Sequence, residues 1–301
     1  MSTGTKIQWT EATWNPLSGC TPVSPGCLHC YAATMSHRLE AMGQPKYKGL
    51  TVLRNGVRTF NGTIRLDEKA LTIPLHWKKP RHIFVNSMSD LFHKDVPFEF
   101  VDKVFAVMEQ CPQHTFQVLT KRPERMAEYL NQSAFGDWPL PNVWLGTSVE
   151  NQKCADERIP WLLQCPAAVR FLSCEPLLGP IDLGDCLDDE TYGDEGGDGP
   201  CSAIDWVIVG GESGPNARRC DVNWIADIIR QCRDAGLPCF VKQLGSRPFK
   251  GDVGSPDGWP VKDGPVNWET GEIHLKDSHG ADMAEWPEEL RVREWPKGGG
   301  Q

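Results

Sequence analysis

The sequence predicts an α/β fold: a parallel (β/α) barrel of six to eight β/α units, closed or partly open. Short apolar runs recur along the chain, and helical patterns lie between most of them. Strands that alternate with helices predict a parallel sheet. Polar residues follow most of the apolar runs, at the carboxyl ends of strands, where such barrels carry their chemistry.

The apolar runs are typical of strands buried on both faces. Six strong runs cover residues 81–90, 115–122, 142–151, 169–176, 204–214 and 238–245, and two weaker ones cover 7–14 and 63–66. No Gly-x-Gly-x-x-Gly turn follows any of them, which disfavours an open doubly wound sheet.

Three segments between the runs predict helices. Residues 31–42 follow a group of cysteines, and 97–110 begin with a proline suited to a first helical turn. Residues 221–235 begin with Asp221, a good N-cap, and stop before Gly236.

Two regions depart from this rhythm. Residues 184–200 are acidic and Gly-rich, which predicts a mobile loop inside a barrel domain of residues 1–245. Residues 246–301 predict an irregular C-terminal appendage packed on the barrel, in which VNWETGEIHL suggests a hairpin.

Composition narrows the class of protein. The 301 residues are 40% hydrophobic, and no apolar run approaches the roughly 20 residues of a membrane span. We expect no membrane partner and a cytoplasmic location. The net charge is −9, but eight acids and no base lie between Asp182 and Asp198. Local acidity argues mildly against binding a nucleic-acid backbone.

The N-terminal cysteines are the main candidate for chemistry. Cys20, Cys27 and Cys30 have the spacing C-x6-C-x2-C, and two prolines and a glycine in the longer gap predict a loop. Three thiolates leave one coordination position of a metal centre open. The trio suits an iron–sulfur cluster, zinc with His29 or His37 as fourth ligand, or plain buried cysteines. The other nine cysteines are scattered, and most sit in apolar segments as small hydrophobes.

The ordered motifs resemble a known family. The run WTEATWNPLSGCTPVSPGCLHCYA is similar to the three-Cys-motif family of phages, prophages and bacterial genomes, a divergent radical S-adenosylmethionine (SAM) branch. The likeness continues through FVNSMSDLFH, LTKRPER, VWLGTSVEN, FLSCEPLLGPI, VIVGGESG, FVKQLG and EWPEELRVREWP. It implies a (β/α) barrel, a [4Fe–4S] cluster on the three cysteines and SAM on the fourth iron. The usual radical SAM spacing is C-x3-C-x2-C, so the first gap is longer here.

A more distant likeness to spore photoproduct lyase suggests SAM-binding residues. Ser87, Ser89 and Asp90 end one strand pattern and would accept hydrogen bonds from the SAM ammonium. Lys121 would pair with the SAM carboxylate.

The ribose hydroxyls would bond to residues that end the next strand pattern. These are Ser148, Glu150 and Asn151. Two further strand-end residues, Glu175 and Glu212, are candidate contacts to substrate or SAM.

Ordinary structural roles compete with these assignments. Asp90 also suits a helix cap, Lys121 a solvent-exposed position, and Ser148 and Asn151 the start of the next helix. Glu175 and Glu212 both suit turns. Lys242 lies inside a strand pattern, where a buried lysine needs a partner.

The sequence therefore predicts a radical-SAM-like enzyme that cleaves SAM and starts radical chemistry. Its substrate is unknown, with a nucleobase or nucleic acid as first guess, and it would need an electron donor. The alternative is a non-catalytic binding module, stabilised by zinc or an iron–sulfur centre, that acts with a partner protein in phage or defence functions.

Overall fold

The computed structural model describes residues 5–132, 138–187, 204–252 and 264–296. The chain forms two compact units. Unit 1 comprises Met1–Thr147 and Arg158–Arg170, and unit 2 comprises Ser148–Glu157 and Phe171–Gln301. This division differs from the boundary after residue 245 that the sequence suggested.

The main sheet confirms the expected α/β class with parallel strands. Its seven strands have the order β1-β6-β7-β8-β9-β10-β12. The five pairings whose register is described in it are all parallel. β1 and β12 end this order, so the described strands form the open version of the expected sheet.

Four strands of this sheet lie wholly or mostly in unit 1. They are β1 (Ala12–Trp14), β6 (His82–Val85), β7 (Thr115–Thr120) and β8 (Val143–Ser148). Trp14 pairs with Val85, and Val85 pairs with Val118, so the carboxyl ends of β1, β6 and β7 meet at one edge. The weak strand prediction at 63–66 fails for the main sheet, because β5 (Arg65–Leu66) pairs antiparallel with β2 (Leu17–Ser18).

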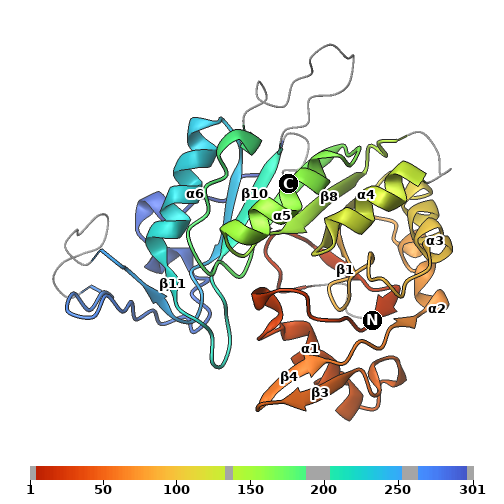
Figure 1. Cartoon of the computed structure of the whole chain (residues 1–301), viewed down its shortest axis with the longest axis horizontal. Helices are drawn as coiled ribbons and strands as arrows, with labels where there is room; N and C mark the ends of the chain where they lie inside the picture. Colours follow the sequence, from red (N-terminus) through yellow and green to blue (C-terminus); the bar gives the residue numbers. More distant parts are fainter. Residues whose placement is uncertain (1–4, 133–137, 188–203, 253–263, 297–301) are drawn as a thin grey trace. The chain divides into compact units, whose positions relative to one another are not determined.

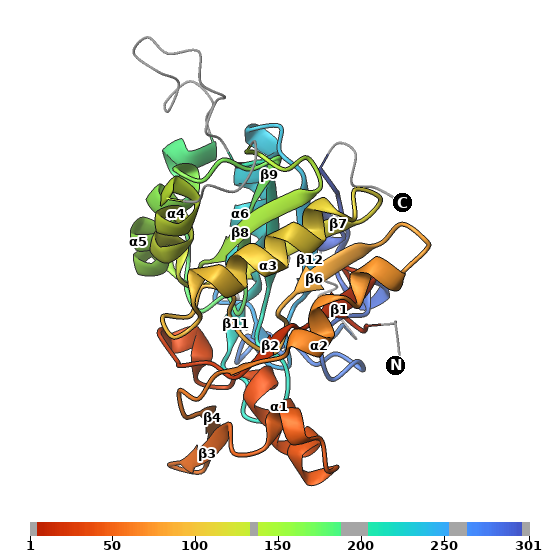
Figure 2. The same cartoon turned by 90° about the vertical axis from the view of Figure 1, so that its right-hand side faces the viewer.

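The helices of unit 1 cover its strands with apolar faces. α3 (Phe98–Glu109, Figure 2) buries an apolar stripe, including Val104 and Phe105, against the core. The others are α1 (Tyr31–Ala41), α2 (Glu68–Leu71) and α4 (Pro123–Gln132), with short 3-10 turns η1 (Pro25–Cys27), η2 (Pro45–Tyr47) and η3 (Pro74–His76).

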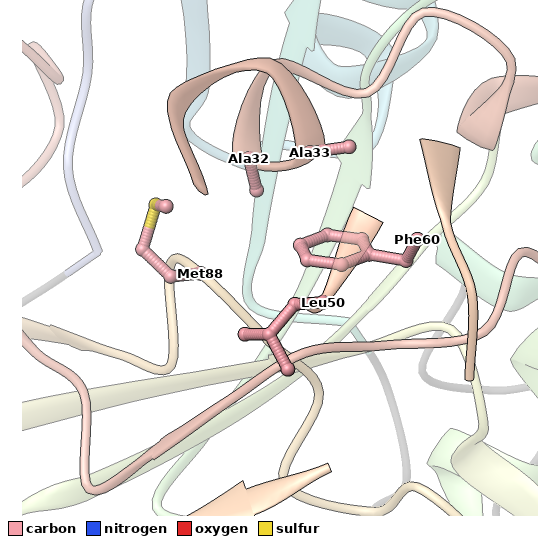
Figure 3. Packing of buried hydrophobic residues seen from close by; sticks show 5 residues of the cluster. All are labelled: Ala32, Ala33, Leu50, Phe60 and Met88. Atoms are coloured by element: carbon pink, nitrogen blue, oxygen red, sulfur yellow. The ribbon is translucent and has the colours of Figure 1, made fainter. Parts of the chain in front are cut away.

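A small lobe stands apart from the main sheet within unit 1. The sequence did not predict its antiparallel hairpin of β3 (Thr51–Arg54) and β4 (Val57–Phe60), which lies beside α1 (Figure 1). Between them is a separate core of Ala32, Ala33, Leu50, Phe60 and Met88 (Figure 3).

Unit 2 contains most or all of the last three strands of the sheet, together with α6 and part of α5. β9 (Val169–Cys174), β10 (Trp206–Gly210) and β12 (Cys239–Gln243) are almost wholly buried, as the sequence predicted. α6 (Val222–Asp234) has Asp221 as its N-cap, whose side chain accepts a hydrogen bond from Asn223 N. α5 (Gln152–Leu163) contributes residues to both units.

The C-terminal segment packs along β12. Residues 292–294 run antiparallel to that strand, with Val241 N donating to Val292 O and Glu294 N to Cys239 O. This segment covers what is otherwise an edge strand. The suggested hairpin is present as an antiparallel bridge between Val266 and Ile273. Short elements complete the unit: β11 (Cys220–Asp221), β13 (Pro248–Phe249), η5 (Met283–Glu285) and η6 (Glu288–Leu290).

The acidic stretch is not uniformly a loop. Its first residues form the 3-10 turn η4 (Gly184–Leu187), because Cys186 and Leu187 are apolar and buried. Residues 188–200 lie outside the described part of the chain. Among the helices that are described, none has the length and apolar character needed to cross a bilayer.

Candidate metal centre

The cysteine loop lies at the carboxyl ends of the unit 1 strands. It follows β1 and β2, and Gly19 at its start forms a parallel bridge with Ser89, which follows β6. Ser89 Oγ also donates to Leu17 O at 3.2 Å. The loop therefore begins along the segment that carries Ser87 and Asp90.

Arg122 fastens this loop to the sheet. Its Nη1 lies 2.6 Å from Asp90 Oδ2, and its Nη2 donates to the carbonyl oxygen of Thr21 at 2.7 Å. The two guanidinium nitrogens lie 3.8 and 4.0 Å from Cys20 Sγ. One planar side chain thus joins the end of β7 to the segment that follows β6 and to the cysteine loop.

Asp90 is a buried anchor in this structure. Besides Arg122, its carboxylate accepts hydrogen bonds from Thr120 Oγ1 at 2.7 Å, Phe92 N at 3.0 Å and Lys121 N at 3.2 Å. Both oxygens are therefore used by protein donors. The expected contact of Asp90 with the SAM ammonium would have to displace one of them.

The three thiols lie within electrostatic reach of one another. Burial, followed by the negative charge of Asp90, raises the pKa of Cys20 to about 12; Arg122 opposes this rise, and thiolates at Cys30 and Cys27 contribute to it. Burial also raises the pKa of Cys30, against which the backbone N–H of Ala33 acts. That N–H is available because Cys30 is the N-cap of α1, and a helix N-terminus favours an anionic sulfur.

The chemical identity of the three cysteine donors fits a metal centre better than their arrangement in space does. Cys20 and Cys30 both pack against the small core of the lobe, and Cys27 ends the turn η1. Yet no three His, Cys, Asp or Glu side chains among the described residues are arranged to grip an ion. Three soft thiols beside a helix N-terminus and a guanidinium are chemically suited to an iron–sulfur cluster, which would draw them closer.

The other expected residues of unit 1 surround this loop. Ser87 Oγ donates to Asn15 Oδ1 at 3.2 Å, and Ser87 O accepts from Tyr31 Oη at 2.6 Å. Lys121 lies near enough for its ammonium to lower the pKa of Cys30, opposing the larger effect of burial. Among the expected residues, Lys121 is thus a cation and Asp90 an anion whose charge reaches the thiols.

His93, which the sequence interpretation missed, lies next to Thr21 of the cysteine loop. His93 Nδ1 accepts from Asp95 N at 3.2 Å, so its proton lies on Nε2, which is 2.8 Å from Thr21 Oγ1. Burial and the nearby Arg122 lower the pKa of His93, which keeps this ring neutral.

The remaining expected residues belong to unit 2. Ser148 and Glu150 are buried, and Asn151 Oδ1 accepts from Cys154 N at 3.0 Å, which makes it a cap of α5. The competing role of a helix start is thus realised for Asn151.

Glu175 and Glu212 each have a basic partner within unit 2. Lys242 Nζ lies 2.8 Å from Glu175 Oε1, which supplies the partner that a lysine in a strand requires. Arg218 donates to Glu212 from its backbone N at 2.8 Å, from Nε at 2.9 Å and from Nη2 at 2.5 Å. Neither carboxylate is an isolated charge.

Arg122 was the most informative residue to be overlooked. It stands next to Lys121 in LTKRPER, and a second basic residue at a strand end is a signal that the sequence did contain. No comparable signal pointed to Asn15, Thr21 or His93. In both the Asn15–Ser87 pair and the Thr21–His93 pair the partners are 72 positions apart in the sequence.

Comparison with known proteins gives one match. A family model described as "Protein of unknown function (DUF5131)" matches residues 4–278. No curated protein and no solved structure matches the chain.

Proposed function

Because the chain belongs to the DUF5131 family, whose description names no activity, we propose a function from the chain's own site. The proposed function is that of a radical-SAM-like enzyme, with a [4Fe–4S] cluster on Cys20, Cys27 and Cys30 and SAM on its fourth iron. One observation carries this proposal: Arg122 contacts Thr21 O and Cys20 and so fastens the cysteine loop at the carboxyl ends of parallel strands. In parallel α/β sheets this is the edge at which ligands bind.

The chain's own residues would prepare the thiols for a cluster. Arg122 places positive charge beside Cys20, and the α1 N-terminus places N–H groups beside Cys30, so both oppose the rise in thiol pKa that burial causes. Asp90 holds Arg122 in position. When bound, the cluster supplies the electron that cleaves SAM and starts radical chemistry on a substrate.

SAM would contact residues that are not engaged in the Arg122–Asp90 ion pair. Lys121 is proposed to pair with the SAM carboxylate, because its charge already acts on Cys30. Ser148, Glu150 and Asn151 remain proposed ribose contacts, and Glu175 and Glu212 proposed substrate or SAM contacts. A (β/α) barrel of the radical SAM type and a cytoplasmic location, where thiols stay reduced, belong to the same proposal.

Anaerobic reconstitution with iron and sulfide tests the cluster. We expect about four irons and four sulfides per chain, as three-cysteine ligation of a cubane implies. The triple variant with Cys20, Cys27 and Cys30 changed to alanine should bind none. The Cys111→Ala variant is the control, since Cys111 is another buried thiol of unit 1.

Two outcomes would contradict the proposal. A stoichiometric cluster in the triple variant would show that the ligands lie elsewhere. Colourless protein that contains one zinc, released on changing the three cysteines, would favour the alternative of a metal-stabilised binding module that acts with a partner.

A further inference from the structure

The lobe beside the cysteine loop is basic in an acidic protein. Residues 20–66, which comprise the cysteine loop and this lobe, contain six Lys and Arg and one acid, Glu40, which gives them a net charge of +5. Since the whole chain carries −9, the remaining residues carry −14. The opposite charges are therefore segregated along the chain.

Part of this charge is compensated and part is exposed. Lys46 pairs with Asp67 at 3.0 Å, and Arg65 Nη1 donates to Pro45 O at 2.8 Å. Arg38, Lys48 and Arg54 are exposed and form no ion pair within the described part of the chain. Unpaired surface cations gathered on one small lobe are the electrostatic signature of a polyanion site.

Two of these cations belong to the hairpin and to α1, Arg54 to β3 and Arg38 to α1. Asn55 and Gly56 form the turn with φ of 48° and 77°, so Arg54 stands at the tip of the hairpin. Arg58 of β4 lies 3.4 Å from His37 of α1, Nη2 to Nε2, and Arg38 is the next residue on that helix. Figures 1 and 2 both show α1 beside β3 and β4.

The same lobe exposes flat and apolar side chains. Tyr31 is 56% exposed, while the hydrogen bond of its hydroxyl to Ser87 O fixes the orientation of its ring. Met35 follows four residues later, on the same face of α1, and Leu28 precedes the helix; both are exposed. An immobilised exposed aromatic ring next to cations suits the stacking of a nucleobase.

We propose that this lobe binds single-stranded nucleic acid, DNA or RNA, as the substrate of the enzyme. The phosphates would contact Arg38, Lys48 and Arg54, and a base would stack on Tyr31. A single strand offers both a regular anionic backbone and exposed apolar bases, which this surface requires together. The role as substrate rests on the proposed function, whereas binding itself does not.

The lobe lies next to the three cysteines, where a bound strand could be a substrate. Tyr31 directly follows Cys30, and Cys20 and Cys30 pack against the core of the lobe shown in Figure 3. A strand held here would lie beside the three thiols. The acidic remainder of the chain would repel polyanions from other surfaces.

Fluorescence anisotropy with a fluorescein-labelled 20-mer, in DNA and RNA versions, tests the binding on the full chain without any cofactor. Three phosphate contacts on a single strand predict a slope of log affinity against log salt of about −2. Affinity would then fall about 20-fold between 50 and 200 mM salt. Because no cluster is needed, failure here leaves the cluster test intact, and failure there leaves this one intact.

Charge reversal locates the site. The Arg38→Glu/Arg54→Glu variant should lose at least tenfold in affinity at 50 mM salt, and its salt slope should shrink. The Lys78→Glu/Lys79→Glu variant makes the same change of charge at exposed residues outside the lobe, and it should bind nearly as well as the original chain. Tyr31→Leu should weaken binding with the salt slope unchanged.

Three results would overturn the assignment. They are the absence of binding at 50 mM salt, equal losses in the two charge-reversal variants, and displacement of the oligonucleotide by poly-glutamate at equal charge. The last would identify the lobe as a docking surface for an acidic protein.

Discussion

Arg122 and Asp90 form a buried ion pair, Nη1 to Oδ2 at 2.6 Å. The pair joins the segments that follow β7 and β6, next to the cysteine loop. The side chains are only 14% and 7% exposed. Because Arg122 also donates to Thr21 O, the pair sets where the loop lies. Asp90, which the sequence suggested as a contact of the SAM ammonium, thus serves in this structure as an anchor of the cysteine loop.

Breaking this pair should be costly. Arg122→Met leaves the Asp90 carboxylate buried without its cation, which should lower the free energy of unfolding by about 3 kcal/mol. Adding Asp90→Asn should restore part of that loss, and urea unfolding measures both. Arg230→Ala is the control, since its pair with Asp227 is exposed, and it should change little. Equal effects of Arg122→Met and Arg230→Ala would contradict the anchoring role.

Gly19 should tolerate no side chain. Its φ is +94°, and a Cβ there would meet the carbonyl oxygen of Thr63 and approach Leu50. Gly19→Ala should therefore destabilise the chain by well over the roughly 1 kcal/mol that a left-handed conformation alone costs an L-residue. Gly49→Ala has φ of +69° and open space around it, so it isolates the conformational part. Thermal unfolding compares the two variants, and similar midpoints would refute the steric argument.

Lys121 should matter for SAM and little for folding. If its ammonium pairs with the SAM carboxylate, Lys121→Ala should weaken SAM binding about 10- to 150-fold, as loss of a bond worth about 1.5–3 kcal/mol implies. Calorimetry on the cluster-loaded protein measures this affinity. Lys94→Ala, which removes an exposed lysine of unit 1, is the control. Unchanged affinity on removing Lys121 would assign it to the surface.

Glu175 and Lys242 should stabilise unit 2 only as a pair. Lys242→Met removes the cation 2.8 Å from Glu175 Oε1 and should cost about 1.5–3 kcal/mol. The Lys242→Met/Glu175→Gln double variant should recover part of the loss, because no unpaired charge then remains. Additive losses in urea unfolding would show that the two groups do not interact.

Buried histidines should make stability depend on pH. Burial lowers the pKa of His114 below its ordinary 6.5, so the folded state binds its proton less readily than the unfolded state does. Stability is full above pH 6.5 and should fall as the pH drops from 6.5 towards the folded pKa. The midpoint of thermal unfolding of the His114→Gln variant should fall less between pH 7.5 and 5.5 than that of the original chain. An unchanged pH dependence would mean that other groups cause it.

The parallel α/β class was predictable from the sequence alone, because strands that are buried on both faces require uninterrupted apolar runs. The helices α3 and α6 and the loop that carries the three cysteines were predictable in the same way. Local patterns carried all of these, since periodicity, caps and prolines act between near neighbours.

Tertiary structure alone decided which polar residues meet. Asp90 and Arg122 are 32 positions apart, and Thr21 and Arg122 are 101 apart, so no local pattern indicated that they converge. The β3–β4 hairpin was missed because its Asn-Gly turn is flanked by short, half-exposed strands with little apolar alternation. The division into units was also tertiary, since it follows from packing between segments distant in sequence rather than from a linker.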